Sequence, residues 1–358
     1  IMAIALSHGG ATQYTSSKRS QELLVGTKEG VAIMEQDATG SWRISHRGLP
    51  DLHISSLILP PQTDLIFAGA FHGSIYASRD GGRTWMSRDS GLTQDDVYSL
   101  AWVERSGGVR LYAGTEPAHL FYSDDFGLNW TELPGIRKVG SVPSWSFPAP
   151  PHIAHTKNIT FDPANPNHVL VSIEQGGLLK STDGGQTFND LEGFHNDVHR
   201  ILVHPQDSKR IFMTGGDGVY VSSDAGITWD HRTDRSDGIG GYPDTLVLHP
   251  RQPDLMFIGA AHSNPGSWQT SHYAGAKISR SDDAGKTWNQ VRSGLPSDLQ
   301  GSIEAMCLED YGDSFSIFFG TTSGEVFSSQ DGGDHWELIM EGLTPISKGG
   351  HYRALTTA

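Results

Sequence analysis

Histidine is the residue type in this chain with the widest range of chemistry, and the sequence contains 17 histidines. Two of them stand just before short apolar runs: His155 precedes residues 159–161, and His199 precedes residues 201–203. Neutral imidazole is a common ligand of zinc, copper, iron and nickel, and three or four imidazoles around an open position can support catalysis. No His-Glu-x-x-His motif joins a pair locally, so only folding can assemble such a site.

Other groups that can move protons or orient a substrate also stand at the start of apolar runs. They are Tyr98, Lys157, Arg200, Asp244 and Glu304. If these runs are strands that start around one axis, their polar first residues meet at one place. The inward-facing set depends on strand register, which the sequence leaves uncertain by one residue.

An internal repeat supplies such an axis. The pattern Ser-x-Asp-x-Gly-x-x-Trp/Phe recurs along the chain, with a worn seventh copy near the start. Its aspartates are Asp37, Asp80, Asp125, Asp183, Asp224, Asp283 and Asp331. The aspartate can accept N–H bonds within its own turn, the glycine permits a positive φ, and the aromatic residue can pack between sheets. Around each copy we find four strand-like runs, with about 51 residues per repeat, as in a propeller blade.

The pattern resembles the Asp-box, or BNR, repeat over almost the whole chain. The resemblance implies an all-β, seven-bladed β-propeller of four-stranded antiparallel blades, with a structural Asp-box turn between the third and fourth strands. Seven repeats make one closed ring, so residues 1–358 are predicted to form a single domain. We expect residues 353–357 to supply an inner strand to the first blade, which would hide the last sheet edges.

In such a blade the start of the first strand and the turn between the second and third strands share one face, called the top face here. Ligand sites of propellers commonly lie there, at the mouth of the central channel. The repeat alignment assigns ten of the 17 histidines to this face. They are His53, His72, His119, His152, His155, His195, His199, His262, His272 and His351. From these we select four metal ligands: His53, His155, His199 and His351.

Three long insertions, residues 131–153, 230–241 and 262–276, are also expected on the top face. Their length and aromatic residues are typical of the walls of a pocket. The candidate substrate-binding residues are His72, His119, Trp145, Lys157, Tyr242, His262, Trp268 and Arg353.

These observations favour an enzyme with a divalent transition metal, either Zn, Mn, Fe or Cu, in a top-face pocket. The expected chemistry is that of a hydrolase or lyase acting on a carbohydrate or other small molecule. Its catalytic candidates are Tyr98, Arg200, Asp244 and Glu304. Some polysaccharide lyases with seven-bladed propellers use His, Tyr and Arg beside a metal, which Tyr98, His199 and Arg200 resemble in residue type.

Two alternatives stay open. The Asp-box class includes sialidases and xyloglucan-cleaving enzymes, and a metal-free glycoside hydrolase would need two carboxylates, which Asp96, Asp197, Asp244 or Glu304 could supply. Sialidases carry a Phe/Tyr-Arg-Ile-Pro motif, which this sequence lacks, and an arginine triad, whereas few arginines are expected at the mouth of this channel. The class also includes non-catalytic scaffolds, such as the photosystem II assembly factor and sortilin-type receptor ectodomains.

Composition restricts the partners. The net charge of −15 disfavours nucleic acid and anionic membranes, and no apolar run approaches the roughly 20 residues that cross a bilayer. The lone cysteine, Cys307, lies in an apolar run and is expected to be a core residue. No signal peptide is recognised, which favours the cytoplasm, although a leader already removed would leave no trace. Oligomeric state does not follow from the sequence.

Overall fold

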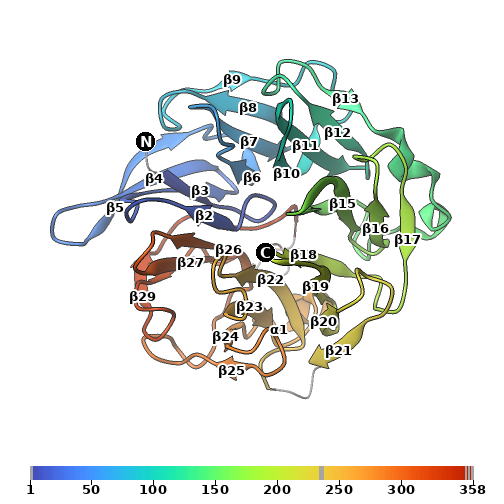
Figure 1. Cartoon of the computed structure of the whole chain (residues 1–358). Coiled ribbons are helices and arrows are strands. Elements are labelled where there is room, and N and C mark those ends of the chain that lie inside the picture. Colours follow the sequence, from blue (N-terminus) through green and yellow to red (C-terminus); the bar gives the residue numbers. More distant parts are fainter. Residues whose placement is uncertain (1–2, 234–237, 351–352, 354, 356–358) are drawn as a thin grey trace.

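Seven β-sheets stand around a central axis in the computed structural model, which describes residues 3–233, 238–350, 353 and 355 (Figure 1). The first three blades are β1 (Ala3–Leu6), β3 (Glu22–Thr27), β4 (Gly30–Gln36) and β5 (Trp42–Gly48); β6 (His53–Ile58), β7 (Ile66–Phe71), β8 (Ser74–Ser78) and β9 (Met86–Ser87); and β10 (Asp96–Arg105), β11 (Gly108–Glu116), β12 (Leu120–Ser123) and β13 (Thr131–Glu132). The next two are β14 (Thr156–Asp162), β15 (Asn165–Ile173), β16 (Gly177–Ser181) and β17 (Asn189–Leu191); and β18 (Val198–His204), β19 (Asp207–Gly215), β20 (Gly218–Ser222) and β21 (Asp230–Thr233). The last two are β22 (Tyr242–Leu248), β23 (Met256–Ala261), β24 (Lys277–Ser281) and β25 (Asn289–Gln290); and β2 (Gln13–Thr15), β26 (Ile303–Asp310), β27 (Phe315–Thr321), β28 (Val326–Ser329) and β29 (Glu337–Met340). The seven-bladed all-β fold predicted from the repeats is therefore confirmed.

Helices are few and short. Two 3-10 helices, Pro134–Lys138 and Val142–Ser144, lie in the first long insertion, and α1 (Pro265–Ser271) lies in the third. Within the described part of the chain, no helix has both the length and the apolar character needed to cross a bilayer.

The core is divided among the contacts between neighbouring blades. Each of seven buried apolar clusters combines side chains from two adjacent sheets. Trp130 of the third blade packs with Phe67 of the second, and Trp336 of the seventh packs with Phe257 of the sixth. The Asp-box aromatics thus join one blade to the next, as the repeat pattern predicts.

The Asp-box turns lie between the third and fourth strands, and their hydrogen bonds repeat from blade to blade. In the turn after β16, the Asp183 carboxylate accepts bonds from the Thr187 amide at 2.9 Å and the Thr187 hydroxyl at 2.6 Å. The Ser181 hydroxyl bonds Asp183 at 2.8 Å and accepts the Gly185 amide at 2.9 Å. The aspartate therefore satisfies turn donors, which is a structural role.

Asp183→Asn is expected to lower the free energy of unfolding at pH 7 by about 1 kcal/mol, because the amide replaces a charged acceptor within the turn. The bonds from Thr187 lower the pKa of Asp183 from 3.8 to about 2. The ionised Asp183 carboxylate therefore makes its full contribution to the free energy of unfolding above its unfolded-state pKa. This contribution is lost as the pH falls through about 2. Urea unfolding from pH 7 to pH 2 should show the two proteins converging at the acid end. A constant difference at every pH would contradict this account, and exposed Asp51→Asn is the matched control.

Both inner edges where the ring closes are covered by the N-terminal segment. Strand β1 pairs in parallel with β3 as the inner strand of the first blade, and β2 pairs in parallel with β26 of the seventh. The prediction that residues 353–357 supply the inner strand of the first blade is wrong. Most of that segment lies outside the described residues, and Leu355 packs with Tyr242 and Trp268 of the sixth blade. Strand β1 occupies the inner position of the first blade that the prediction gave to this segment.

A β-bulge interrupts six inner strands at the same level, near their first residues. In each pair the inner strand has one residue more than its partner, as where Thr156 and Asn158 pair with Ile173 and Ser172. A bulge leaves the extra residue outside the ladder and turns its side chain away from the regular alternation. The six extra residues are Ser55, Tyr98, Lys157, His199, Asp244 and Glu304.

Candidate functional site

The bulged residues gather at the top end of the central channel. All six are at most 4% exposed although all are polar or aromatic. Lys157 of the fourth blade lies 3.0 Å from Asp244 of the sixth, a contact that is possible only across the channel. The bulges therefore place side chains from successive blades in one buried cluster.

Glu174, in the turn after β15, is the centre of this cluster. Its carboxylate contacts His155 Nε2 at 2.6 Å, Lys348 Nζ at 2.8 Å and Lys157 Nζ at 3.4 Å. Lys348 also lies 3.0 Å from Asp244. The other ring nitrogen of His155, Nδ1, lies 3.2 Å from Glu116.

Opposite charges keep these buried groups ionised. Burial opposes ionisation of Glu174, but Lys157 and Lys348 hold its pKa well below the usual range. The same balance lowers the pKa of Asp244. Burial opposes the charged form of His155, yet Glu174 raises its pKa overall. The carboxylates of the cluster are Glu116, Glu174, Asp197, Asp244 and Glu304, and the basic groups are His155, Lys157, Arg200 and Lys348.

His199 and Asp197 form an unusual contact on the other side of Glu174. His199 Nδ1 donates to the Pro243 carbonyl oxygen at 2.7 Å, which leaves Nε2 as an acceptor in the neutral ring. Nε2 lies 3.3 Å from Asp197 Oδ1, and neither atom has a partner with hydrogen-bond geometry. Ligand atoms of Glu174, Asp197 and His199 all lie within 4.8 Å of one another. Two buried acceptors that face each other favour a proton or a cation between them.

The channel below the cluster is filled by residues 7–12, here called the channel loop. Its Gly9 amide donates to Ser55 O at 2.8 Å, and the Leu100 amide donates to Gly9 O at 3.1 Å. The Arg200 guanidinium donates to the carbonyl oxygens of His8 and Gly10. Arg200, predicted to be catalytic, therefore holds the channel loop, and burial lowers its pKa to about 10.

The cluster is covered by residues 344–350, here called the strap. The Ser347 hydroxyl donates to Glu304 at 2.8 Å, and Ser347 O accepts from His53 Nε2 at 2.8 Å. Lys348 is fully buried between Glu174 and Asp244. A Cβ added to Gly349 would lie 2.0 Å from the Tyr98 hydroxyl, so the strap backbone contacts that ring directly.

The four predicted metal ligands have different surroundings. His155 and His199 both lie beside Glu174, but both ring nitrogens of His155 contact carboxylates. His53 bonds the strap instead. His351 lies outside the described residues. Of the three described members, the structure brings His155 and His199 to one carboxylate, and His199 belongs to a group of side chains that could hold a metal ion.

The predicted substrate-binding residues divide into an inner and an outer group. Lys157 and Tyr242 are inner residues, and Tyr242 contacts the His199 ring at 4.6 Å between centroids. Trp268 is fully buried behind Tyr242, so it supports the site without lining it. The remaining members lie elsewhere: His72 pairs with Asp96, His119 with Glu132, Trp145 with Ser141, and His262 and Arg353 are exposed.

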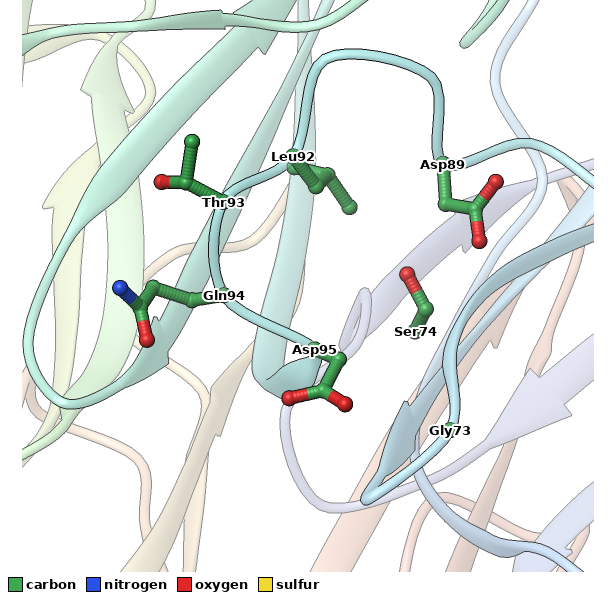
Figure 2. A pocket seen from close by; sticks show the side chains of 7 residues that line it. All are labelled: Gly73, Ser74, Asp89, Leu92, Thr93, Gln94 and Asp95. Carbon is green, nitrogen blue, oxygen red and sulfur yellow. The ribbon is translucent and has the colours of Figure 1, made fainter.

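Two hollows on the surface of the described residues lie away from the channel, and channel residues line neither of them. One, of about 470 Å³, lies beside β8 and the loop before β10 and has Ser74, Asp89 and Asp95 among its lining residues (Figure 2). The other, of about 580 Å³, lies at the opposite ends of the strands, between Arg210, Arg251 and Arg280. Each of these arginines has a carboxylate partner, so the second hollow offers no unbalanced positive charge.

Glu174 and Lys348 are the central residues that the sequence analysis missed. Glu174 occupies the turn between a second and a third strand, as do His72 and His119, so extending the same rule to carboxylates would have found it. Lys348 follows the last repeat and has no equivalent in the other blades. No sequence signal indicates its burial.

No protein-family model matches the chain. Among curated proteins, vacuolar protein sorting/targeting protein 10 of Aspergillus terreus is 32% identical over 131 residues, which are 35% of this chain and 8% of that protein. A xyloglucanase of Hypocrea jecorina is 27% identical over 281 residues, 65% of this chain and 30% of the enzyme. The photosystem II assembly lipoprotein Ycf48 of Synechococcus sp. is 23% identical over 286 residues, 76% of this chain and 74% of that protein.

Solved structures support the same fold. The GH74 xyloglucanase from Xanthomonas campestris superposes with a TM-score of 0.69 at 16% identity, over 94% of this chain and 55% of that one. YCF48 bound to D1 peptide gives a TM-score of 0.51 at 17% identity, over 77% of this chain and 79% of that one.

The ring of blades defines the chain as a seven-bladed β-propeller, and its repeated turns resemble the Asp-box (BNR) pattern. Its relatives include glycoside hydrolases and a photosystem assembly protein. The chain spans less than a third of the xyloglucanase and less than a tenth of the sorting protein, so their whole activities do not transfer to it.

Proposed function

We propose that the protein is a metal-dependent enzyme, of the hydrolase or lyase type, that acts on a carbohydrate or other small polar molecule at the top end of the channel. The observation that carries the proposal is the contact between His199 Nε2 and Asp197 beside Glu174. Similarity to xyloglucanases supports carbohydrate as the substrate class.

The donor set fits a transition-metal ion. One imidazole and two carboxylates suit zinc, manganese or iron, and the bond from His199 Nδ1 to Pro243 O fixes the ring as outer partners of metal ligands do. A divalent ion held there would lower the pKa of a bound water or polarise a substrate oxygen. This set replaces the four histidines predicted from the sequence and keeps only His199 from them.

The neighbouring residues would orient the substrate and move protons. The rings of Tyr98 and His155 stack with their centroids 3.8 Å apart. Both side chains carry protons that they could exchange with a substrate, and they lie on the same side of the channel. Burial raises the pKa of the Tyr98 hydroxyl well above its usual value, so this group stays protonated and can donate. The remaining catalytic candidates, Asp244 and Glu304, face the strap and would bind substrate once the strap moves.

Metal analysis of the purified protein tests the proposal. The protein is treated with chelator and then titrated with zinc or manganese, and we expect near-stoichiometric binding to the parent. Asp197→Asn and His199→Ala should each bind the metal at least about tenfold more weakly, because each variant changes one of the proposed ligands. Asp197→Asn keeps the side-chain shape if His199→Ala fails to fold. His46→Ala removes an exposed histidine from β5 and should bind like the parent.

Absence of metal in the parent under all these conditions would refute the metal mechanism. The carboxylates would then favour metal-free glycoside hydrolysis, and a folded protein inactive on oligosaccharides would favour a scaffold.

A further inference from the structure

The strap presents to the channel the polar groups of a ligand. Its Ser347 hydroxyl and Lys348 amide both donate to Glu304, at 2.8 and 3.1 Å. Its Lys348 ammonium lies 2.8 Å from Glu174 and 3.0 Å from Asp244. The carbonyl oxygen of Ser347 accepts from His53. The strap thus presents one hydroxyl donor, one amide donor, one carbonyl acceptor and one primary ammonium. The hydroxyl groups and the ammonium of an amino sugar could take the places of these groups.

The charges of the cluster select a cationic occupant over a neutral one. Glu174 and Asp244 are fully buried and share two ammonium groups, those of Lys157 and Lys348. If Lys348 left and a neutral sugar entered, Asp244 would keep Lys157, and Glu174 would keep Lys157 and His155. The two carboxylates would therefore lose one of the two ammonium groups that they share. Uncompensated buried charge is strongly unfavourable, whereas a ligand ammonium would restore the balance.

The strap can exchange with a ligand because its apolar and polar anchors are separate. Ile346 is fully buried among side chains of the first and seventh blades and contacts Gly320. From Ser347 to Gly349 the strap is held by polar contacts and by the Tyr98 ring. A ligand that reproduces the polar contacts offsets their loss, while Ile346 stays in place as the pivot.

We propose that the top end of the channel binds a ligand with a primary ammonium group among hydroxyl groups, of the amino-sugar class, and that Lys348 occupies this site from within the chain. The inference rests on the proposed function, since it names the substrate class of the same site. A lysine-bearing peptide shares the ammonium but lacks the ring hydroxyls, and it is the competing occupant in the test.

Ligand titration of the Lys348→Ala protein is the primary experiment. By calorimetry, glucosamine should bind this variant at least about tenfold more tightly than N-acetylglucosamine, whose nitrogen is uncharged, and more tightly than it binds the parent. Adding Asp244→Asn should abolish the preference. Equal binding of the two sugars, or binding of neither to the folded variant, would overturn the proposal. Stronger binding of acetyl-Ile-Ser-Lys-Gly-amide than of glucosamine would also overturn it, in favour of a peptide site.

The parent protein provides a second readout that does not need the variant to fold. Trypsin cleaves after lysine, and Lys348 is fully buried in the closed strap. Glucosamine should accelerate cleavage after Lys348, and N-acetylglucosamine should not; unchanged cleavage with glucosamine would count against the proposal.

Running both experiments with and without zinc separates this inference from the proposed function. Amine selectivity in a protein that takes up no metal would support the amino-sugar site while the metal mechanism fails. Stoichiometric metal without amine selectivity would do the reverse.

Discussion

Asp244→Asn is expected to lower the free energy of unfolding by about 3–5 kcal/mol, because it leaves two buried ammonium groups with one carboxylate fewer. Asp244 lies 3.0 Å from both Lys157 and Lys348, and all three side chains are at most 1% exposed. Neither contact has hydrogen-bond geometry at the Asp244 oxygens, so charge rather than bond direction determines the effect. Urea unfolding at pH 7, followed by two optical probes, measures it.

Two controls make this prediction specific. Lys157→Met combined with Asp244→Asn removes one charge of each sign and should recover most of the loss, since the remaining Lys348 keeps Glu174 as its partner. Asp254→Asn removes an exposed carboxylate 3.8 Å from Arg210 and should cost less than about 0.5 kcal/mol. A loss below about 1 kcal/mol in the single Asp244→Asn variant would mean that water reaches the cluster and screens it.

Gly9→Ala is expected to destabilise the protein by about 3 kcal/mol, because the channel loop has no space for a side chain at this position. A Cβ on Gly9 would lie 2.1 Å from the carbonyl oxygen of Tyr98, which belongs to the inner strand of the third blade. The clash is with backbone, so it cannot be relieved by a change of rotamer. The loop must shift instead, and its bonds to Ser55 and Leu100 are lost.

Thermal and urea unfolding of Gly9→Ala beside Gly107→Ala test this prediction. A Cβ on Gly107, in the turn between β10 and β11, would have no atom within 4 Å, so Gly107→Ala should be neutral or slightly stabilising. Equal stability of Gly9→Ala and Gly107→Ala would show that the channel loop can leave the channel at little cost.

The position of each blade along the chain could be predicted from the sequence, because the same kind of turn recurs from blade to blade and the same residue types form its hydrogen bonds. The Ser–Asp–Gly–Trp turns have the same bonds in successive blades, at Asp80 as at Asp183. The assignment of residues to the top face followed from strand direction alone. It correctly located the first residues of the inner strands, including His53 at the start of β6 and His199 at the start of β18.

The side chains that face the channel could not be predicted, because a bulge changes the register by one residue. In a regular strand, the side chains of His199 and Arg200 would point to opposite faces of β18. The sequence does not indicate which of the two would face the channel. The bulge aims His199 at Glu174 and leaves Arg200 to bind the channel loop. Glycine or another small residue opposite the bulge, such as Gly114 or Gly259, is visible in the sequence but has several structural meanings.

By itself, the sequence determined a propeller of seven four-stranded blades with a repeated turn, since these features depend on local turns and on neighbours one repeat apart. Only the tertiary structure decided what fills the channel. The contact between Glu174 and Lys348 joins residues 174 positions apart, and Arg200 holds a loop 192 positions away. Among the described residues, these contacts across the channel do not recur from one repeat to the next. They exist because a closed ring brings the starts of its inner strands to one point, where buried charges must find partners from whichever segments reach them.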